Sequence, residues 1–183
     1  MILSNNEVWA RKAKYLTTQA KDDALEFVHN EIGYNYRLPN IQAAMGCAQM
    51  EQLNDYILTK RQIASDYVKA LADVPGITLM KEAPWAFSTF WMTTVLINEE
   101  VYGMNSRALL KCLTENGIQT RPLWQPMHQS KAHPGAQAIG IEVADKIHRA
   151  ALSLPSSVGL TPAELANIIR LINEFARKGN TAI

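Results

Sequence analysis

A long helical pattern dominates the first half of this sequence, from Asn40 to about Ala72. Its only glycine is Gly46, and its apolar residues recur at the three- and four-residue spacing of an amphipathic helix. Pro39 and Pro75 supply a start and a stop. Such a helix is ~50 Å long, whereas a compact body of this size is roughly 26 to 32 Å wide. We therefore expect part of it to pack outside its own domain, and a bend near Gln52.

The composition is that of a globular chain, with 48% hydrophobic and 19% charged residues among 183. This length fits one ordinary domain or two small ones. A net charge of +1 gives no large field, which argues against nucleic acid and membrane surfaces as partners. No apolar run approaches the ~20 residues of a membrane span, and residues 1–6 lack a secretion signal, so we expect a cytoplasmic protein.

The remaining pattern predicts alternating helices and strands. Residues 1–3 resemble the end of a buried strand, and Asn5 or Asn6 can cap a helix over residues 7–16. Residues 17–30 have no period and predict a loop. Further along, we expect strands at 77–80, 90–97 and 118–121, the last ended by Pro122, and helices at 105–117, 141–150 and 161–179. This order predicts a layered α+β module.

Neither cysteine suggests a metal site or a disulfide. Cys47 and Cys112 lie inside apolar helical patterns, with no CxxC motif, so we expect buried thiols. His29, His133 and His148 have no partner at metal-ligand spacing, and no metal is expected.

The first candidate site is the segment from Gly33 to Asn40, directly before the long helix. A helix N-terminus presents unpaired N–H groups, and the Asn35 amide with the Arg37 guanidinium would complete an anion-binding set suited to phosphate. The alternative is that Asn35 and Arg37 bond to backbone carbonyls in a tight turn allowed by Gly33, while Tyr34 and Tyr36 only pack.

The second candidate site is the loop at residues 121–128. It brings together Arg121, Trp124 and His128, which could line a pocket with one apolar wall and two polar groups. The alternative is an ordinary proline-stiffened connection in which Trp124 fills part of the core.

The sequence lacks two features that would indicate a particular kind of binding or catalytic site. The sequence has no GxGxxG and no GxxxxGK, so neither a dinucleotide fold nor a P-loop is indicated. No lysine is set up as a nucleophile, which requires desolvation or a cationic neighbour. Lys81, after a predicted strand, is the least unsuitable, and the other nine have contexts that indicate exposure to solvent.

Six stretches of the sequence match one known protein family. They are HNEIGYNYRLPNIQAA at 29–44, GCAQ at 46–49, NGI at 116–118, TRPLW at 120–124, LPSS at 154–157 and ILSN at 2–5. These stretches resemble the DegT/DnrJ/StrS family of pyridoxal-phosphate (PLP) dependent sugar aminotransferases. Their residues are most similar to those of members that act on UDP-linked 4-keto-6-deoxy-N-acetylhexosamines.

The resemblance implies roles for four residues. Family members are fold-type I homodimers with active sites at the subunit interface. Asn35 matches the asparagine that reaches the cofactor phosphate of the partner subunit, and Arg37 would face substrate phosphates or hold the same loop. His128, with Trp124 near it, matches a candidate contact for the nucleotide sugar.

The resemblance also implies what this sequence does not contain. The family's Schiff-base lysine, and most of its cofactor site, lie upstream of the stretch that matches residues 2–5. We therefore expect no catalytic residue here. Residues 1–38 would be a remnant of the large cofactor domain and an interface loop, 39–73 a linking helix, and 74–183 a small α+β domain with a short antiparallel sheet covered by helices.

Two functions remain open at this point. The first is the C-terminal portion of an enzyme that transfers an amino group from glutamate to a 4-keto nucleotide sugar, not competent alone and not binding PLP by itself. It would pair with a second copy or with the missing N-terminal part. The alternative is a stand-alone oligomerisation or interaction module. In either case we expect exposed apolar surface at residues 1–3 and on the long helix, covered by a partner chain.

Overall fold

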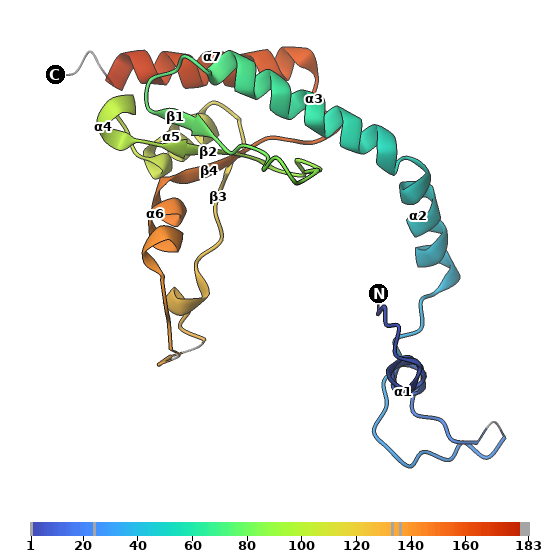
Figure 1. Cartoon of the computed structure of the whole chain (residues 1–183). Coiled ribbons are helices and arrows are strands. Elements are labelled where there is room, and N and C mark those ends of the chain that lie inside the picture. Colours follow the sequence, from blue (N-terminus) through green and yellow to red (C-terminus); the bar gives the residue numbers. More distant parts are fainter. Residues whose placement is uncertain (1, 24, 133, 136, 180–183) are drawn as a thin grey trace. The chain divides into compact units, whose positions relative to one another are not determined.

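Two compact units make up the chain, Met1–Gln52 and Leu53–Ile183. The structure is a computed structural model that describes residues 2–23, 25–132, 134–135 and 137–179 (Figure 1). The boundary between the units falls inside the segment whose pattern predicts one long helix.

The first unit begins with a helix rather than a strand. Helix α1 spans Glu7–Thr17, and the Asn6 side chain accepts hydrogen bonds from the backbone of Val8 and Trp9, which confirms the predicted cap. The predicted buried strand is wrong for residues 2–3, which are exposed and pair with no strand in the part of the chain that the structure describes. A strand needs a neighbour to satisfy its backbone. Met1 lies outside the described residues.

The long helical pattern forms two consecutive helices, α2 (Asn40–Glu51) and α3 (Leu53–Leu71). The interruption at Gln52 lies where the apolar stripe thins. No described residue of α2 is buried, and its large apolar side chains Ile41, Met45 and Met50 are exposed. Cys47, on this helix, is exposed and Cys112 is half-buried, so the expectation of buried thiols is wrong.

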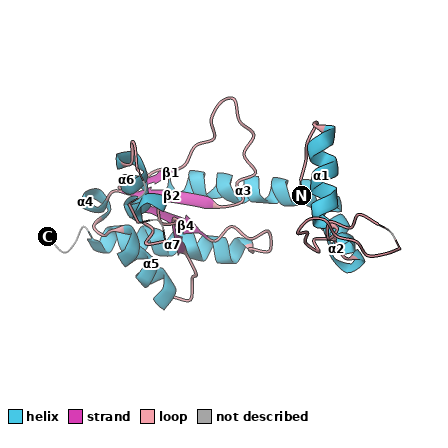
Figure 2. Cartoon of the chain, turned by 90° about the horizontal axis from the view of Figure 1, so that it is seen from below, coloured by secondary structure: helices cyan, strands magenta, loops and turns pink. Residues whose placement is uncertain are grey.

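The second unit is built on a four-stranded antiparallel sheet of order β1-β2-β4-β3. Figure 2 shows β1, β2 and β4 of this sheet in magenta. The strands are β1 (Ile77–Leu79), β2 (Thr93–Ile97), β3 (Arg121–Pro122) and β4 (Ala151–Leu154). The helices are α3, α4 (Glu99–Tyr102), α5 (Ser106–Glu115), α6 (Glu142–Ala150) and α7 (Pro162–Gly179), with a 3-10 turn at Met127–Gln129. Figure 1 shows α3 and α7 side by side over the sheet. This arrangement confirms the α+β prediction.

The core lies between the sheet and these helices. Along β2, Thr93, Val95 and Ile97 are buried and alternate with half-buried residues, as expected for a strand with one face on the core. The side chains that meet this face come from α3, α5 and α7 and include Tyr67, Leu71, Leu109, Leu113, Ile168 and Ile172.

Polar caps fix the predicted helix starts. Asn105 accepts hydrogen bonds from the backbone of residues 107 and 108 and begins α5. Thr161 and Glu164 bond to each other's backbone N–H, which confirms the capping box of α7.

The strands predicted at 90–97 and 118–121 have the wrong bounds, and one observed strand was not predicted. Strand β2 begins at Thr93 because Phe90 adopts a left-handed backbone, φ 45°, which cannot continue a pleat. The third strand begins at Arg121 rather than at residue 118, and it includes Pro122, which pairs with Leu152, since an edge strand tolerates a missing N–H. Strand β4 was not predicted, because it follows α6 directly with no turn signal.

Within the residues that the structure describes, none of the helices is long and apolar enough to cross a membrane. The same residues contain no group of three or more histidine, cysteine, aspartate or glutamate side chains arranged to hold a metal ion.

Candidate functional site

The first candidate site lies in the first unit, where the backbone at Gly33 passes close to the backbone of Gln19 and Ala20. A β-carbon added at Gly33 would lie 2.3 Å from the backbone nitrogen of Ala20, so no larger residue fits there. The backbone of Tyr34 donates to the Leu16 carbonyl (2.7 Å) and accepts from Gln19 N–H (3.0 Å). These bonds fix the loop that carries Asn35 against the end of α1.

The structure gives Asn35 and Arg37 different surroundings. Asn35 is exposed and pairs through its backbone with Thr18, while its side-chain amide has no hydrogen-bond partner among the described residues. Arg37 donates to the side-chain oxygen of Gln19 (3.0 Å) and, at 3.5 Å, to the Thr18 carbonyl. The guanidinium is therefore partly engaged in holding the turn, whereas the Asn35 amide remains available to a ligand.

An aspartate that sequence reasoning missed anchors the same loop. Asp22 accepts hydrogen bonds from Asn30 N–H (2.8 Å) and the Tyr15 hydroxyl (2.9 Å). The Asn30 bond, followed by the Tyr15 bond, lowers the pKa of Asp22. Burial and the bond to Asp22 raise the pKa of Tyr15 to about 12. Asp22 lies in a segment without periodicity, so only its position before a turn could have indicated this role.

The second candidate site lies in the second unit. Trp124 stacks on Trp91, with ring centroids 5.9 Å apart and an interplanar angle of 14°. Both rings are exposed, so Trp124 does not fill the core. The His128 ring is instead turned to Asp145, with Nε2 2.7 Å from the carboxylate. The loop thus presents an aromatic pair and a separate histidine whose Nε2 is already bonded.

Asp145 is the polar centre of the His128 region. Its carboxylate also accepts a hydrogen bond from the Gln129 amide (2.6 Å). Burial alone would raise the pKa of Asp145, but the bonds from His128 and Gln129 outweigh burial and lower it. The partially buried Asp145 carboxylate is therefore held in its charged form, which orients the His128 ring.

The other predicted histidines and lysines have no site geometry. The Nδ1 atom of His148 is buried without a described partner, His29 Nδ1 lies 2.8 Å from the Gln19 carbonyl, and His133 lies outside the described residues. Lys81 is exposed and therefore not desolvated as a nucleophile would need. Lys60 contradicts the expectation of an exposed side chain: it is half-buried, and burial lowers its pKa.

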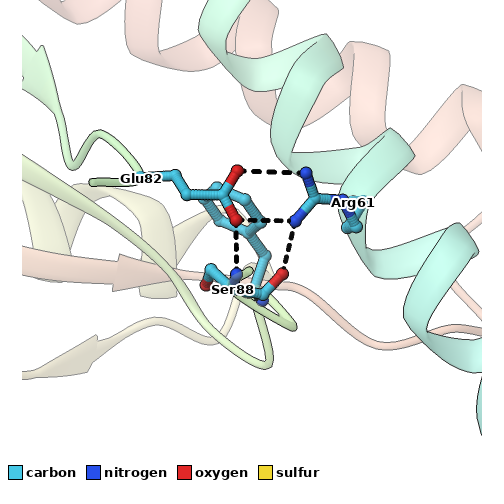
Figure 3. A network of polar contacts seen from close by, with 4 residues as sticks. Arg61, Glu82 and Ser88 are labelled. Carbon is cyan, nitrogen blue, oxygen red and sulfur yellow. Dashed lines mark hydrogen bonds and ion pairs between the residues drawn. The ribbon is translucent and has the colours of Figure 1, made fainter. Parts of the chain in front are cut away.

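An arginine and glutamate pair organises the loop before β2 (Figure 3). Arg61 donates to both carboxylate oxygens of Glu82, at 2.9 and 3.0 Å, and to the Ser88 carbonyl at 2.6 Å. Ser88 N–H donates back to Glu82. The guanidinium also lies over the rings of Phe87 (4.3 Å) and Phe90 (5.5 Å). The Arg61 bond, with the Ser88 bond, lowers the pKa of Glu82 to about 2.

Replacing Glu82 by glutamine should make the melting temperature depend less on pH in the acid range. The folded-state pKa of Glu82 lies below its ordinary value of 4.5, so its stabilising contribution is present above pH 4.5 and lost as the pH falls toward about 2. We expect the melting temperature of the wild type to fall across this window more steeply than that of Glu82→Gln. Thermal melts at several pH values measure this, with the exposed Glu115→Gln as the control. Equal slopes for wild type and Glu82→Gln would contradict the prediction.

The family model of the DegT/DnrJ/EryC1/StrS aminotransferases matches residues 1–173. The chain belongs to this family. Among curated relatives of this aminotransferase family, EpsN of Bacillus subtilis, named as a pyridoxal phosphate-dependent aminotransferase, is 32% identical over 94% of this chain and 45% of its own length. GDP-perosamine synthase of Vibrio cholerae is 28% identical over 96% of this chain and 47% of its own. The chain therefore spans about half the length of the curated relatives it matches.

The solved structures show the same aminotransferase fold. TlmJ from Streptoalloteichus hindustanus, an aminotransferase, superposes on 97% of this chain with a TM-score of 0.85 at 20% identity, and the match covers 47% of its length. The predicted family and fold class are confirmed. The similarity to members acting on UDP-linked N-acetylhexosamines remains a prediction.

Proposed function

We propose that this chain supplies positioning groups to a PLP-dependent sugar aminotransferase whose catalytic lysine lies on polypeptide outside this sequence. The observation that carries the proposal is the exposed Asn35 amide, without a described partner, on a loop that Gly33 fixes against α1. The family match over residues 1–173 and the chain's coverage of about half of its relatives support it. PLP, when bound, supplies the electron sink for amino transfer.

Asn35 fits a phosphate group in chemical type and in availability. Its amide can donate to an anionic oxygen, and such charge-assisted bonds are stronger than neutral ones. Arg37, tied to Gln19 and Thr18 in the same loop, adds fixed positive charge without needing to reorganise. We infer that Asn35 holds the cofactor phosphate of a partner subunit and that Arg37 supports the loop.

We propose that the loop carrying Trp124 and His128 contacts the substrate. A nucleotide sugar with a 4-keto group would accept the amino group that glutamate donates to the cofactor. Because Nε2 of His128 is bonded to Asp145, only the remaining ring nitrogen is available for a substrate contact. Asp145 then orients the ring.

The proposed organisation assigns residues 1–38 to the large cofactor domain, 39–73 to a linking helix and 74–183 to the small domain. The exposed apolar side chains of the first unit support a second copy, or the rest of the enzyme, as the partner that covers them. They include Ile2, Leu3, Trp9, Ile32, Ile41, Met45 and Met50. We place such a dimer in the cytoplasm. A stand-alone interaction module gains no support from EpsN and the GDP-perosamine synthase of Vibrio cholerae, both of which are named as enzymes.

Replacing Asn35 by alanine should weaken PLP binding in the complete enzyme. The assay combines this chain with the N-terminal half of a relative such as EpsN and titrates PLP by absorbance. Loss of one charge-assisted hydrogen bond predicts about 10- to 100-fold weaker affinity. Asn35→Asp should bind still more weakly, because its carboxylate repels the phosphate. Asn5→Ala, another exposed asparagine of the same unit, is the matched control, and unchanged PLP affinity in Asn35→Ala would remove the phosphate assignment.

A further inference from the structure

An aromatic pair on the surface of the second unit brings together two distant segments. Trp91 precedes β2 and Trp124 follows β3, yet their rings lie 5.9 Å apart and nearly parallel. Trp91 is 62% and Trp124 69% exposed. Two indoles that stack while exposed offer their outer faces to another planar group.

Lys60 of α3 holds the backbone beside this pair. Its ammonium donates to the carbonyl of Trp91 (3.0 Å) and to the carbonyl of Ser156 (2.7 Å). The Ser156 hydroxyl accepts from Thr93 N–H (2.9 Å), so the start of β2 and the turn after β4 are joined twice. A half-buried lysine with two backbone acceptors is a fixed group rather than a solvated one.

The residue before Trp91 shows that this backbone is constrained. Phe90 has φ 45°, a left-handed conformation that disfavours any residue with a β-carbon. It is held on one side by Ser88, whose hydroxyl accepts from Phe90 N–H (3.1 Å), and on the other by the Lys60 bond to Trp91. Conformations of this kind persist where surrounding contacts enforce them, and they gather at ligand sites.

We propose that Lys60 is a positioning residue that holds Trp91 against Trp124, and that this pair is a stacking platform for the base of a nucleotide. The choice of a nucleotide rests on the proposed function. A planar base stacks on an indole face without regard to its hydrogen-bonding edge. The platform would therefore accept several bases and leave the choice of sugar to other groups.

The positioning role is tested by circular dichroism, because two stacked indoles give an exciton couplet in the far ultraviolet. We expect the wild type to show the couplet and Trp91→Phe to lose it. Lys60→Met, which removes the donor and keeps the aliphatic stem, should lose most of it, while Lys60→Arg should restore it. Lys69→Met, at an exposed lysine of the same helix, is the control. A wild type without the couplet, or an unchanged couplet in Lys60→Met, would overturn the role of Lys60.

If Lys60→Met does not fold, Lys60→Gln carries the same test, because its amide still donates one bond. We expect it to retain a weakened couplet, and an unweakened couplet would likewise count against Lys60.

The binding role is tested by titrating UDP and GDP into the chain while recording tryptophan fluorescence. Trp91→Ala and Trp124→Ala should each weaken binding at least about fivefold, the effect of losing one stacked base. Lys60→Met should weaken it to a similar degree. Trp85→Ala, an exposed tryptophan of the same loop, is the control and should bind as the wild type does. No saturable binding, or equal loss in Trp85→Ala, would overturn the platform. Because Asn35→Ala is read by PLP affinity, failure of the two proposals is distinguishable.

Discussion

Replacing Leu152 by alanine should lower the free energy of unfolding of the second unit by about 2 to 5 kcal/mol. Leu152 is fully buried and lies on the central strand β4, where it pairs with Val95 on one side and Pro122 on the other. Backbone hydrogen bonds hold β2 and β3 in place on either side of β4. The structure therefore cannot collapse into the space that the lost methyl groups leave. The cost therefore includes a cavity as well as lost apolar burial.

The measurement is urea unfolding followed by tryptophan fluorescence in a Trp9→Phe background. The remaining tryptophans, Trp85, Trp91 and Trp124, then all report on the second unit. Leu58→Ala, at an exposed leucine of α3, is the matched control and should change the free energy of unfolding by less than about 0.5 kcal/mol. Equal effects of the two substitutions would show that β4 is not the centre of the core.

Replacing Gly76 by alanine should cost about 2 to 6 kcal/mol, because backbone strain and a steric clash coincide there. Gly76 has φ 78°, and an added β-carbon would lie 2.5 Å from the backbone nitrogen of Tyr102. Its carbonyl also accepts from Asn98 N–H (2.8 Å), so the turn cannot move away without losing that bond.

Gly117 separates these two causes. It has a similar φ, 77°, but no atom lies within 4 Å of an added β-carbon. Gly117→Ala should therefore cost only the strain of the left-handed conformation, about 1 to 2 kcal/mol. Urea unfolding of both variants gives the comparison, and a Gly117→Ala cost equal to that of Gly76→Ala would refute the clash.

Local signals predicted the longer helices well, although the four-residue helix α4 was missed. Asn6, Asn105 and the Thr161–Glu164 pair each fix a helix start through contacts no more than three residues apart, which the sequence displays directly. Strands depend on distant partners, so β4 was missed, and residues 2–3 were predicted as part of a strand although no described strand pairs with them.

The candidate site was predictable in residue type but not in arrangement. Sequence reasoning selected Trp124 and His128, yet their partners Trp91 and Asp145 lie far enough along the chain that no motif joins them. The same holds for Lys60, which bonds to a carbonyl 96 residues away. Its desolvation could not be foreseen from a helical pattern in which lysine normally faces solvent.

Helix α3 directs three of its side chains at backbone carbonyls of the surface loops. Lys60 reaches Trp91 and Ser156, Arg61 reaches Ser88, and the buried Tyr67 reaches the Pro155 carbonyl at 3.0 Å. We therefore expect the loop before β2 and the turn after β4 to unfold in the same cooperative step as the core. These loops then give up, on folding, the conformational entropy that surface loops usually keep in the native state.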